Sequence, residues 1–420
     1  MSAMSDTHDT SEEIITRPTV RVSDVNRPDL PVDWTQLGNT TKAPPIRYPH
    51  DVIDIEDVLA EYPQELTVIG TQGTKITHMD PELVKKVPDS ETLFKLIFRS
   101  HLIKTIVGVN GFSNLQTLEL YDNQIESLEP LTEACEGMKQ SLEILDMSYN
   151  TIRDMGPVSQ FINLEQVYIA NNKIKEIKGL QDLGKLKKLD LGANRIRIMD
   201  KLEGVGSSLE ELWLGKNKIE MITGLDKLTK LKRLDVQSNR LTSISNLSSQ
   251  TATLEELYLA DNGITDEGLF ADIETKTGLS QSFSTLNTLD LSKNKLATTK
   301  HFSHLITLEE LWLSTNDIAN FEDGVHPLES LTNLEGIYME YNPIASQFDY
   351  RTTLSKVVPN LTQIDATMVG AFVLASVNQN ICATSTPTTS TMSVEDTMRH
   401  YQEMAVSRAK AETHGTEQQK

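Results

Sequence analysis

One short pattern, L-x-x-L-x-L-x-x-N-x-I, recurs from about residue 93 to residue 345 and constrains the fold more than any other feature of the sequence. Clear copies are LQTLELYDNQI (115–125) and LEELWLSTNDI (308–318). A weaker copy, LFKLIFRSHLI (93–103), has His101 in place of the asparagine. The most frequent spacing between successive asparagines is 22 residues, and these asparagines are Asn123, Asn150, Asn172, Asn194, Asn217, Asn239, Asn262, Asn294, Asn316 and Asn342.

A unit of 22 residues is too short to bury a core by itself, but stacked copies of the same apolar positions form one continuous core. This is the organisation of a leucine-rich-repeat solenoid, an α/β fold with a curved parallel β-sheet on the concave face and loops, 3₁₀ turns and short helices on the convex face. We expect each x-L-x-L segment to be a short strand. We expect the asparagine side chains to be structural, because an amide can satisfy the backbone groups of a tight buried loop.

The regions outside the repeats differ in composition and divide the chain into four parts. Residues 1–62 are rich in proline and polar residues and are expected to form a mostly disordered, acidic N-terminal arm. The solenoid is expected over residues 63–348, with about 11–12 repeats and an insertion near residues 265–284. A helical segment and a final L-x-x-I-D indicate a C-terminal cap at 349–372, and residues 373–420 read as a linker followed by a possible tail helix.

The charge balance and the cysteines exclude several classes of function. The 420 residues include 60 Asp and Glu against 39 Lys and Arg, a formal net charge of −21, which disfavours binding to nucleic acids or to anionic membranes. Cys135 and Cys382 lie far apart and have no metal-ligand spacing. No run of eighteen apolar residues and no secretory signal are present, so we expect a soluble intracellular protein without metal or cofactor.

No catalytic motif is present: the chain lacks a P-loop, H-E-x-x-H, G-x-S-x-G and an EF-hand loop, so we expect no enzymatic activity. The informative positions instead lie between the second and third apolar residues of each strand, where alternation points side chains away from the core. Acids alternate with aromatic residues along this column, which reads Glu119, Asp146, Tyr168, Asp190, Trp213, Asp235, Tyr258, Asp290, Trp312 and Tyr338.

Tyr and Trp in such a line are typical of protein-binding surfaces. The alternative is that neighbouring side chains cover the rings and that the acids only keep the sheet soluble. The charge is also uneven along the solenoid. Residues 161–240 hold sixteen Lys and Arg against eleven Asp and Glu, whereas residues 251–350 hold four against seventeen. A partner with a basic, partly apolar surface would therefore be attracted to the C-terminal half.

The nearly uniform 22-residue repeats, the strings LGKNKI and QSNRLT and the closing IDAT resemble the leucine-rich-repeat regulatory subunits of protein phosphatase 1, from about residue 66 to residue 369. The resemblance implies a non-catalytic protein of the nucleus and cytoplasm, a monomer on its own, that binds the phosphatase catalytic subunit, together with a further inhibitor subunit. It implies that the concave face controls the assembly, localisation and activity of the phosphatase. Carried over position by position, the partner-binding residues would be Asp146, Tyr168, Asp190, Trp213, Asp290, Glu310, Trp312 and Tyr338.

Two other functions are compatible with the repeats. One is a leucine-rich-repeat scaffold for ciliary or cytoskeletal assembly that uses the same concave face. The other is a component of a ribonucleoprotein, which the acidic column disfavours. The IDAT segment and the alternation of acids with aromatic residues favour the phosphatase subunit over the cytoskeletal scaffold.

Overall fold

The computed structural model describes residues 64–70, 75–87, 90–269, 279 and 282–370, and the backbone of β1 (Val20–Val22). The chain divides into two compact units, residues 1–366 and residues 367–420, and the second is described only to Gly370. Apart from β1, the arm expected over 1–62 lies outside the described residues. The tail expected over 373–420 and most of the insertion also lie outside them.

The first unit is a solenoid built on one parallel β-sheet, whose strands pair in chain order. Between β3 and β13 each strand pairs with the next one along the chain through residues at equivalent repeat positions, so the hydrophobic pattern fixes the register. The strands that follow β1 are β2 (Glu65–Gly70), β3 (Lys95–Arg99), β4 (Thr117–Glu119), β5 (Ile144–Asp146), β6 (Gln166–Tyr168), β7 (Lys188–Asp190), β8 (Glu211–Trp213), β9 (Arg233–Asp235), β10 (Glu256–Tyr258), β11 (Thr288–Asp290), β12 (Glu310–Trp312), β13 (Gly336–Tyr338) and β14 (Gln363–Ile364). In the second unit, β15 (Thr367–Met368) is the one strand among the described residues.

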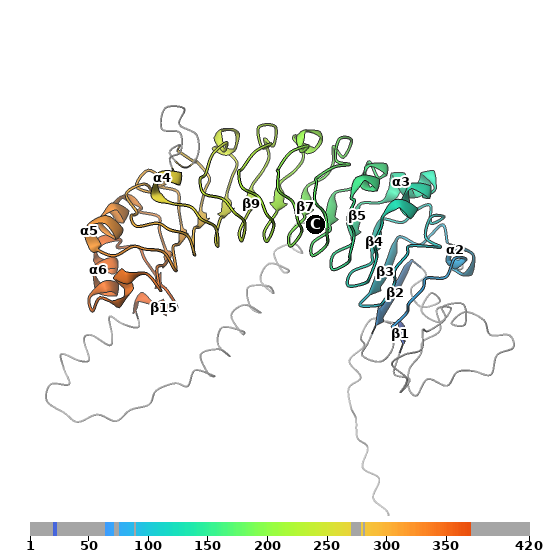
Figure 1. The fold of residues 1–420 in the computed structure, drawn as a ribbon, viewed down its shortest axis with the longest axis horizontal. Helices are drawn as coiled ribbons and strands as arrows, with labels where there is room; N and C mark the ends of the chain where they lie inside the picture. Colours follow the sequence, from blue (N-terminus) through green and yellow to red (C-terminus); the bar gives the residue numbers. More distant parts are fainter. Residues whose placement is uncertain are drawn as a thin grey trace, which may run out of the picture. The chain divides into compact units, whose positions relative to one another are not determined.

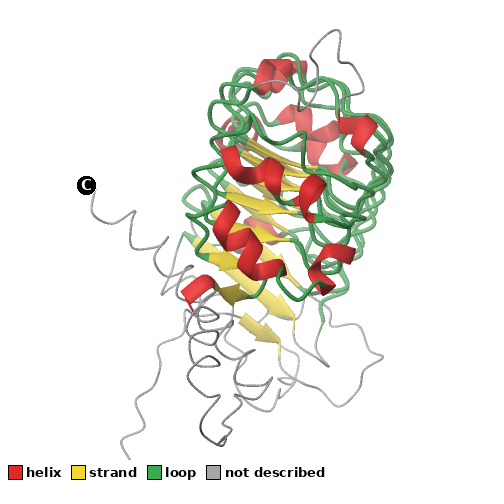
Figure 2. Ribbon diagram, turned by 90° about the vertical axis from the view of Figure 1, so that its left-hand side faces the viewer, coloured by secondary structure: helices red, strands yellow, loops and turns green. Residues whose placement is uncertain are grey.

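The strands follow the inner side of the solenoid arc, and the short helices lie on its outer side (Figures 1 and 2). Among the described residues, the α-helices are α2 (Leu83–Lys86), α3 (Glu136–Ser141), α4 (Asp266–Leu269), α5 (Phe321–Gly324) and α6 (Tyr350–Val357). The 3₁₀ helices in the same described part of the chain are η2 (Glu129–Glu133), η3 (Gly156–Gln160), η4 (Glu203–Val205), η5 (Ser248–Gln250), η6 (His326–Ser330) and η7 (Pro343–Ser346). The predicted leucine-rich-repeat solenoid with its parallel sheet is therefore confirmed.

The core is one continuous stack of the repeated apolar positions. In the repeat that contains β4, for example, Leu115, Leu118, Leu120 and Ile125 are fully buried, and the equivalent residues of the following repeats are buried in the same way. Each repeat covers the apolar side chains of its neighbours, and burial contributes about 1.5 to 3 kcal/mol for each such side chain. The stack therefore depends on repetition rather than on any single repeat.

The asparagine of each repeat joins its own loop to the preceding repeat. The Nδ2 atom of Asn194 donates to the carbonyl oxygens of Ile169 at 2.8 Å, Leu191 at 3.0 Å and Gly192 at 3.2 Å. Its Oδ1 atom accepts the backbone N–H of Ile174 at 2.9 Å. One buried amide thus makes hydrogen bonds to four backbone groups of two adjacent repeats. The structural role predicted for the asparagine column is confirmed.

His101 performs the same task at the N-terminal end of the column. It is buried, its Nδ1 atom accepts the backbone N–H of Ile76 at 3.1 Å, and its Nε2 atom lies 3.2 Å from the carbonyl oxygen of Val68. Both contacts are satisfied when the ring is neutral, with the proton on Nε2. Burial is the main cause that lowers the pKa of His101 to about 4.

The C-terminal end of the solenoid is closed by a buried carboxylate. Asp365 Oδ1 accepts the backbone N–H groups of Met339 at 2.9 Å and Glu340 at 3.0 Å, which follow β13. Asp365 Oδ2 accepts from the guanidinium of Arg351 at 3.1 Å, and the hydroxyl of Tyr350 lies 3.3 Å from Oδ1. Both of these residues belong to α6, so Asp365 ties the last helix to backbone groups for which no further repeat supplies partners.

We predict that His101 makes the solenoid sensitive to acid. Its pKa is about 4 in the folded protein and about 6.5 in an unfolded chain, so protonation favours unfolding. The free energy that His101 contributes is complete above pH 6.5 and falls as the pH decreases towards 4, by about 3 kcal/mol in total. Urea unfolding at several pH values, followed by circular dichroism, measures this loss.

The control for this experiment is His101→Asn, which places the usual residue of the column at this position. The difference in unfolding free energy between wild type and variant should change in favour of the variant as the pH falls from 7 to 4. An identical pH dependence for both proteins would contradict the assignment.

Candidate functional site

The acid and aromatic side chains predicted to leave the core form one continuous row across the sheet, which we call the central row. The register pairs Asp146 with Tyr168, Tyr168 with Asp190, and Asp190 with Trp213, and the pairing continues in this way to Tyr338. The central row consists of Glu119, Asp146, Tyr168, Asp190, Trp213, Asp235, Tyr258, Asp290, Trp312 and Tyr338.

The central row lies on the exposed face of the sheet. The strand residues just before it, such as Leu145, Leu212 and Leu311, are fully buried in the core, whereas Asp146 and Trp213 are partly exposed. Seven of the eight residues that sequence analysis assigned to partner binding lie in this row. Glu310 lies two positions earlier on β12, on the same face. It belongs to a row that we call the first-position row, formed by the first residues of β4 to β13, which are Thr117, Ile144, Gln166, Lys188, Glu211, Arg233, Glu256, Thr288, Glu310 and Gly336.

Each aspartate of the central row accepts a backbone N–H of its own loop on Oδ1. Oδ1 of Asp146, Asp190 and Asp290 accepts the backbone N–H two residues further on, at 2.8 to 2.9 Å. Asp235 makes the same contact at 2.9 Å, and its Oδ2 atom accepts from the side-chain amide of Gln237. Each contact fixes the carboxylate at the end of its strand and stabilises the turn into the asparagine loop.

Burial raises the pKa of these four carboxyl groups above the usual value. The backbone N–H bonds oppose this shift but do not cancel it. For Asp190, the nearby carboxylate of Asp235 is a further cause of the raised pKa. No ion pair neutralises any of the four within the described part of the chain. The row therefore presents partly desolvated negative charge, which a lysine or arginine from outside could neutralise.

Three aromatic rings at the C-terminal end of the central row form a cluster. The ring centroids of Tyr258 and Trp312 are 6.1 Å apart, and those of Trp312 and Tyr338 are 5.7 Å apart, both in edge-to-face geometry. β10 and β12 are two strand spacings apart, about 9.6 Å. The rings of Tyr258 and Trp312 therefore lean towards each other over β11. This explains why Asp290, which lies between them, is only 7% exposed.

The carboxylate of Glu310 has a fixed place beside this cluster. Its Oε2 atom accepts the indole N–H of Trp312 at 3.1 Å. A methyl group at Gly336, on the neighbouring strand, would lie only 2.3 to 2.6 Å from the Glu310 carboxylate. The missing side chain of Gly336 is thus the space that Glu310 occupies. Sequence analysis missed Gly336, although it is the only glycine at the first position of a repeat strand between β4 and β13, and this was the available signal.

The tyrosines of the central row are held by the first-position row or by a neighbouring strand. Tyr168 donates to the amide oxygen of Gln166 at 2.9 Å, and Tyr258 donates to Glu256 at 2.6 Å. The hydroxyl oxygen of Tyr338 accepts from the side-chain amide of Gln363 at 2.5 Å. Their positions are therefore fixed before any partner arrives.

The first-position row is mostly neutralised by cross-strand ion pairs. Lys188 lies 2.9 Å from Glu211, and Arg233 lies 2.6 Å from Glu256. Among the described residues Glu310 has no such cation, so its charge is shared only with the indole of Trp312. In the central row Glu119 is paired with Arg99 at 2.6 Å and Asp290 is nearly covered. The carboxylates most available to a basic partner are therefore those of Asp146, Asp190, Asp235 and Glu310.

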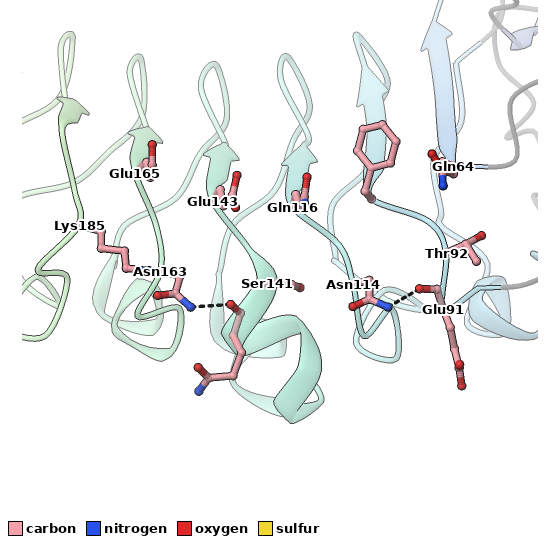
Figure 3. A pocket seen from close by; sticks show the side chains of 12 residues that line it. Gln64, Glu91, Thr92, Asn114, Gln116, Ser141, Glu143, Asn163, Glu165 and Lys185 are labelled. Carbon is pink, nitrogen blue, oxygen red and sulfur yellow. Dashed lines mark hydrogen bonds between the residues drawn. The ribbon is translucent and has the colours of Figure 1, made fainter.

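Other kinds of site find little support in the part of the chain that the structure describes. No group of three or more His, Cys, Asp and Glu side chains there could hold a metal ion. None of its helices has both the length and the apolar character that crossing a bilayer requires. A cavity of about 550 Å³ lies at the edge where β3 to β6 begin, lined mostly by amide and carboxyl side chains such as Gln116, Glu143 and Asn163 (Figure 3). It lacks the apolar lining typical of small-molecule sites.

The parallel sheet, the buried asparagine column and the exposed strand face define a leucine-rich-repeat protein. The family described as Leucine Rich repeats (2 copies) matches residues 140–182, 162–204 and 207–249, and a single Leucine Rich repeat matches residues 252–271. Among solved structures, a leucine-rich-repeat protein of Leptospira interrogans aligns with a TM-score of 0.60 and 23% identity over 72% of each chain. This likeness concerns the fold.

Over part of its length the chain is homologous to regulatory subunits of protein phosphatase 1. It is 32% identical over 149 residues to the protein phosphatase 1 regulatory inhibitor subunit PPP1R7 homolog of Arabidopsis thaliana, covering 34% of this chain and 43% of the relative. It is 35% identical over 71 residues to the protein phosphatase 1 regulatory subunit SDS22 of Schizosaccharomyces pombe, covering 16% of this chain and 21% of the relative. The alignments thus span less than half of either relative.

We predict that the charge of Asp190 lowers the stability of the free protein. Its pKa is raised by burial, so ionisation at neutral pH is unfavourable in the folded state. Asp190→Asn keeps an oxygen for the N–H of Gly192 and removes the charge. The free energy of unfolding at pH 7 should increase by on the order of 0.5 kcal/mol.

This difference should vanish near pH 3, where the wild-type carboxyl group is protonated in both states. Asp182→Asn, at an exposed position outside the central row, is the matched control and should leave stability unchanged. Chemical unfolding at pH 7 and at low pH provides the measurement. A loss of stability in Asp190→Asn at pH 7 would show that the charge itself supports the fold.

Proposed function

We propose that this protein is a non-catalytic regulatory subunit that binds the catalytic subunit of protein phosphatase 1 through the exposed strand face of the solenoid. The observation that carries the proposal is the central row, in which carboxylates and aromatic rings alternate in strict register across the sheet. The homology to phosphatase regulatory subunits supports the identity of the partner. In this proposal the protein is a monomer on its own and acts in the nucleus and cytoplasm.

The aromatic residues provide the apolar anchors of the interface. Trp312 and Tyr338 contact each other edge to face, and Tyr168 and Trp213 lie further along the same row. Rings that are held in place lose little conformational entropy on binding, and Trp and Tyr supply much of the energy of typical interfaces. The partner should therefore place an apolar surface on these rings.

The carboxylates provide charge complementarity. Asp146, Asp190 and Glu310 are partly exposed and lack an ion pair among the described residues, so lysine or arginine side chains of the catalytic subunit would pair with them. Asp290 lies beneath Tyr258 and Trp312 and is nearly covered, so it would act on a partner through these rings or after they move. The association should weaken as the salt concentration increases.

Such binding adds no catalytic group to the phosphatase. It controls the assembly, localisation and activity of the catalytic subunit by covering part of its surface and by bringing it together with a further inhibitor subunit. The rigid sheet suits this task, because it presents its anchors without rearrangement. In a pulldown from cell extract at low salt, the catalytic subunit should be retained. Its presence only in the unbound fraction would contradict the proposal.

We predict that Trp312→Ala combined with Glu310→Ala weakens binding of the catalytic subunit by about 2 to 4 kcal/mol, because the change removes an aromatic anchor and its paired carboxylate. Folding should be little affected, since both side chains lie on the exposed face. Isothermal titration calorimetry measures binding, and thermal unfolding measures stability. Ile306→Ala, which truncates an exposed apolar side chain outside the two rows, is the control.

We predict that Gly336→Ala weakens the same association by about 1 to 2 kcal/mol without unfolding the protein. The new methyl group would displace the flexible end of Glu310 and break its hydrogen bond to Trp312. Calorimetry on Gly336→Ala, on Glu310→Ala and on the variant that combines them tests this route. If Gly336 acts through Glu310, Gly336→Ala adds little to the loss that Glu310→Ala causes. Fully additive losses would show that it acts in another way.

A further inference from the structure

A second charged surface lies on the chain segment that follows each asparagine. In four successive repeats the residue after the asparagine is basic, and in two of them the residue two positions further on is basic as well. We call this surface the basic patch, and its members are Lys173, Lys175, Arg195, Arg197, Lys218 and Arg240. The residue between each such pair is a buried isoleucine, such as Ile174 or Ile196, so the flanking side chains point outward together.

Hydrogen bonds between repeats place these cations side by side on adjacent repeats. Each bond runs to the preceding repeat and measures 2.8 Å. The backbone N–H of Arg195 donates to the carbonyl oxygen of Ile174, that of Lys218 to that of Ile196, and that of Arg240 to that of Ile219. Neighbouring hydrogen-bonded repeats are about 4.8 Å apart, so the basic side chains of the four repeats extend over about 15 Å. The basic patch is therefore short and continuous, and we refer to it below as the strip.

Two acidic side chains of the same repeats are already bound elsewhere. Glu176 pairs with Lys201 and Asp154 pairs with Lys178, and both lysines come from outside the strip. The one ion pair within the strip region is long, at 3.9 Å between Arg240 and Glu220. For the other five cations no carboxylate partner is present in the described part of the chain. This is unusual in a protein whose net charge is −21.

Two exposed apolar side chains border the strip. Ile198 is 62% exposed and Met221 is 56% exposed, and they occupy the same position in adjacent repeats, four residues after Asn194 and Asn217. Side by side on a soluble surface, they add an apolar contact next to the unpaired cations. A surface of this composition is complementary to acidic and apolar residues in one short segment.

We propose that the basic patch, with Ile198 and Met221, binds a short extended polypeptide segment that combines acidic side chains with an apolar residue. A strip of about 15 Å accommodates about five extended residues. A long nucleic acid fits less well, because the same repeats carry the acidic central row on the sheet and the whole chain is strongly negative. The central row lies on the strands, whereas the basic patch follows the asparagine of each repeat. The two surfaces are separate and opposite in charge, so this segment and the basic partner of the central row would bind at the same time.

The test uses the full chain and a fluorescein-labelled peptide, Glu-Glu-Glu-Ile-Glu-Glu-Leu-Glu, in fluorescence anisotropy titrations at 50 and 200 mM salt. Arg195→Glu combined with Lys218→Glu should weaken peptide binding at least tenfold. The milder pair Arg195→Gln and Lys218→Gln should weaken it about threefold. The matched control, Lys185→Glu with Lys230→Glu, changes the net charge equally at exposed positions outside the strip and should change binding less than twofold.

Ile198→Ser combined with Met221→Ser should weaken binding about threefold at both salt concentrations, because the apolar contact is not screened. Absence of peptide binding to wild type, or an equal loss in the control pair, would overturn the proposal. Tighter binding of a ten-nucleotide single-stranded DNA than of the peptide would also overturn it, in favour of a nucleic-acid surface. Calorimetry with the phosphatase catalytic subunit separates the two proposals, since strip variants should leave that affinity unchanged.

Discussion

The stacking of each repeat on its neighbour is the interaction on which the rest of this structure depends. No repeat buries its leucines or satisfies its loop alone, because each asparagine bonds both its own loop and the preceding repeat, as Asn194 does with Ile169 and Ile174. A shift of one residue in any strand would expose its leucines and bury its acids. The register that forms the core is therefore the same register that aligns the central row.

This coupling explains how a surface of partly desolvated charge can be maintained. The carboxyl groups of Asp146, Asp190, Asp235 and Asp290 have raised pKa values because they lie close to the sheet and close to the rings. An isolated strand would not keep them there, but the continuous core holds every strand in place. Keeping these partly buried carboxylates ionised destabilises the free protein. In our proposal, a basic partner offsets this free energy when it binds, as is common where function opposes stability.

Much of this arrangement could be predicted from the sequence, because the period of 22 residues determines both the core and the outward positions. The central row and the role of the asparagines needed only alternation and counting. Side-chain arrangements between strands could not be predicted in this way. The rings that cover Asp290, and the space at Gly336 that Glu310 occupies, depend on rotamers of residues about 20 to 50 positions apart. The pairing of β1 with β2 was also missed, because its three residues carry no repeat signal.

The central claim is that a partner protein binds on the exposed strand face. The most direct test places the photoreactive residue p-benzoylphenylalanine at Trp213, in the middle of the central row, and separately at Ile306, which is exposed outside it. After irradiation with the catalytic subunit of protein phosphatase 1, the account predicts a cross-linked product from position 213 and none from position 306. Cross-linking from position 306 alone would contradict it.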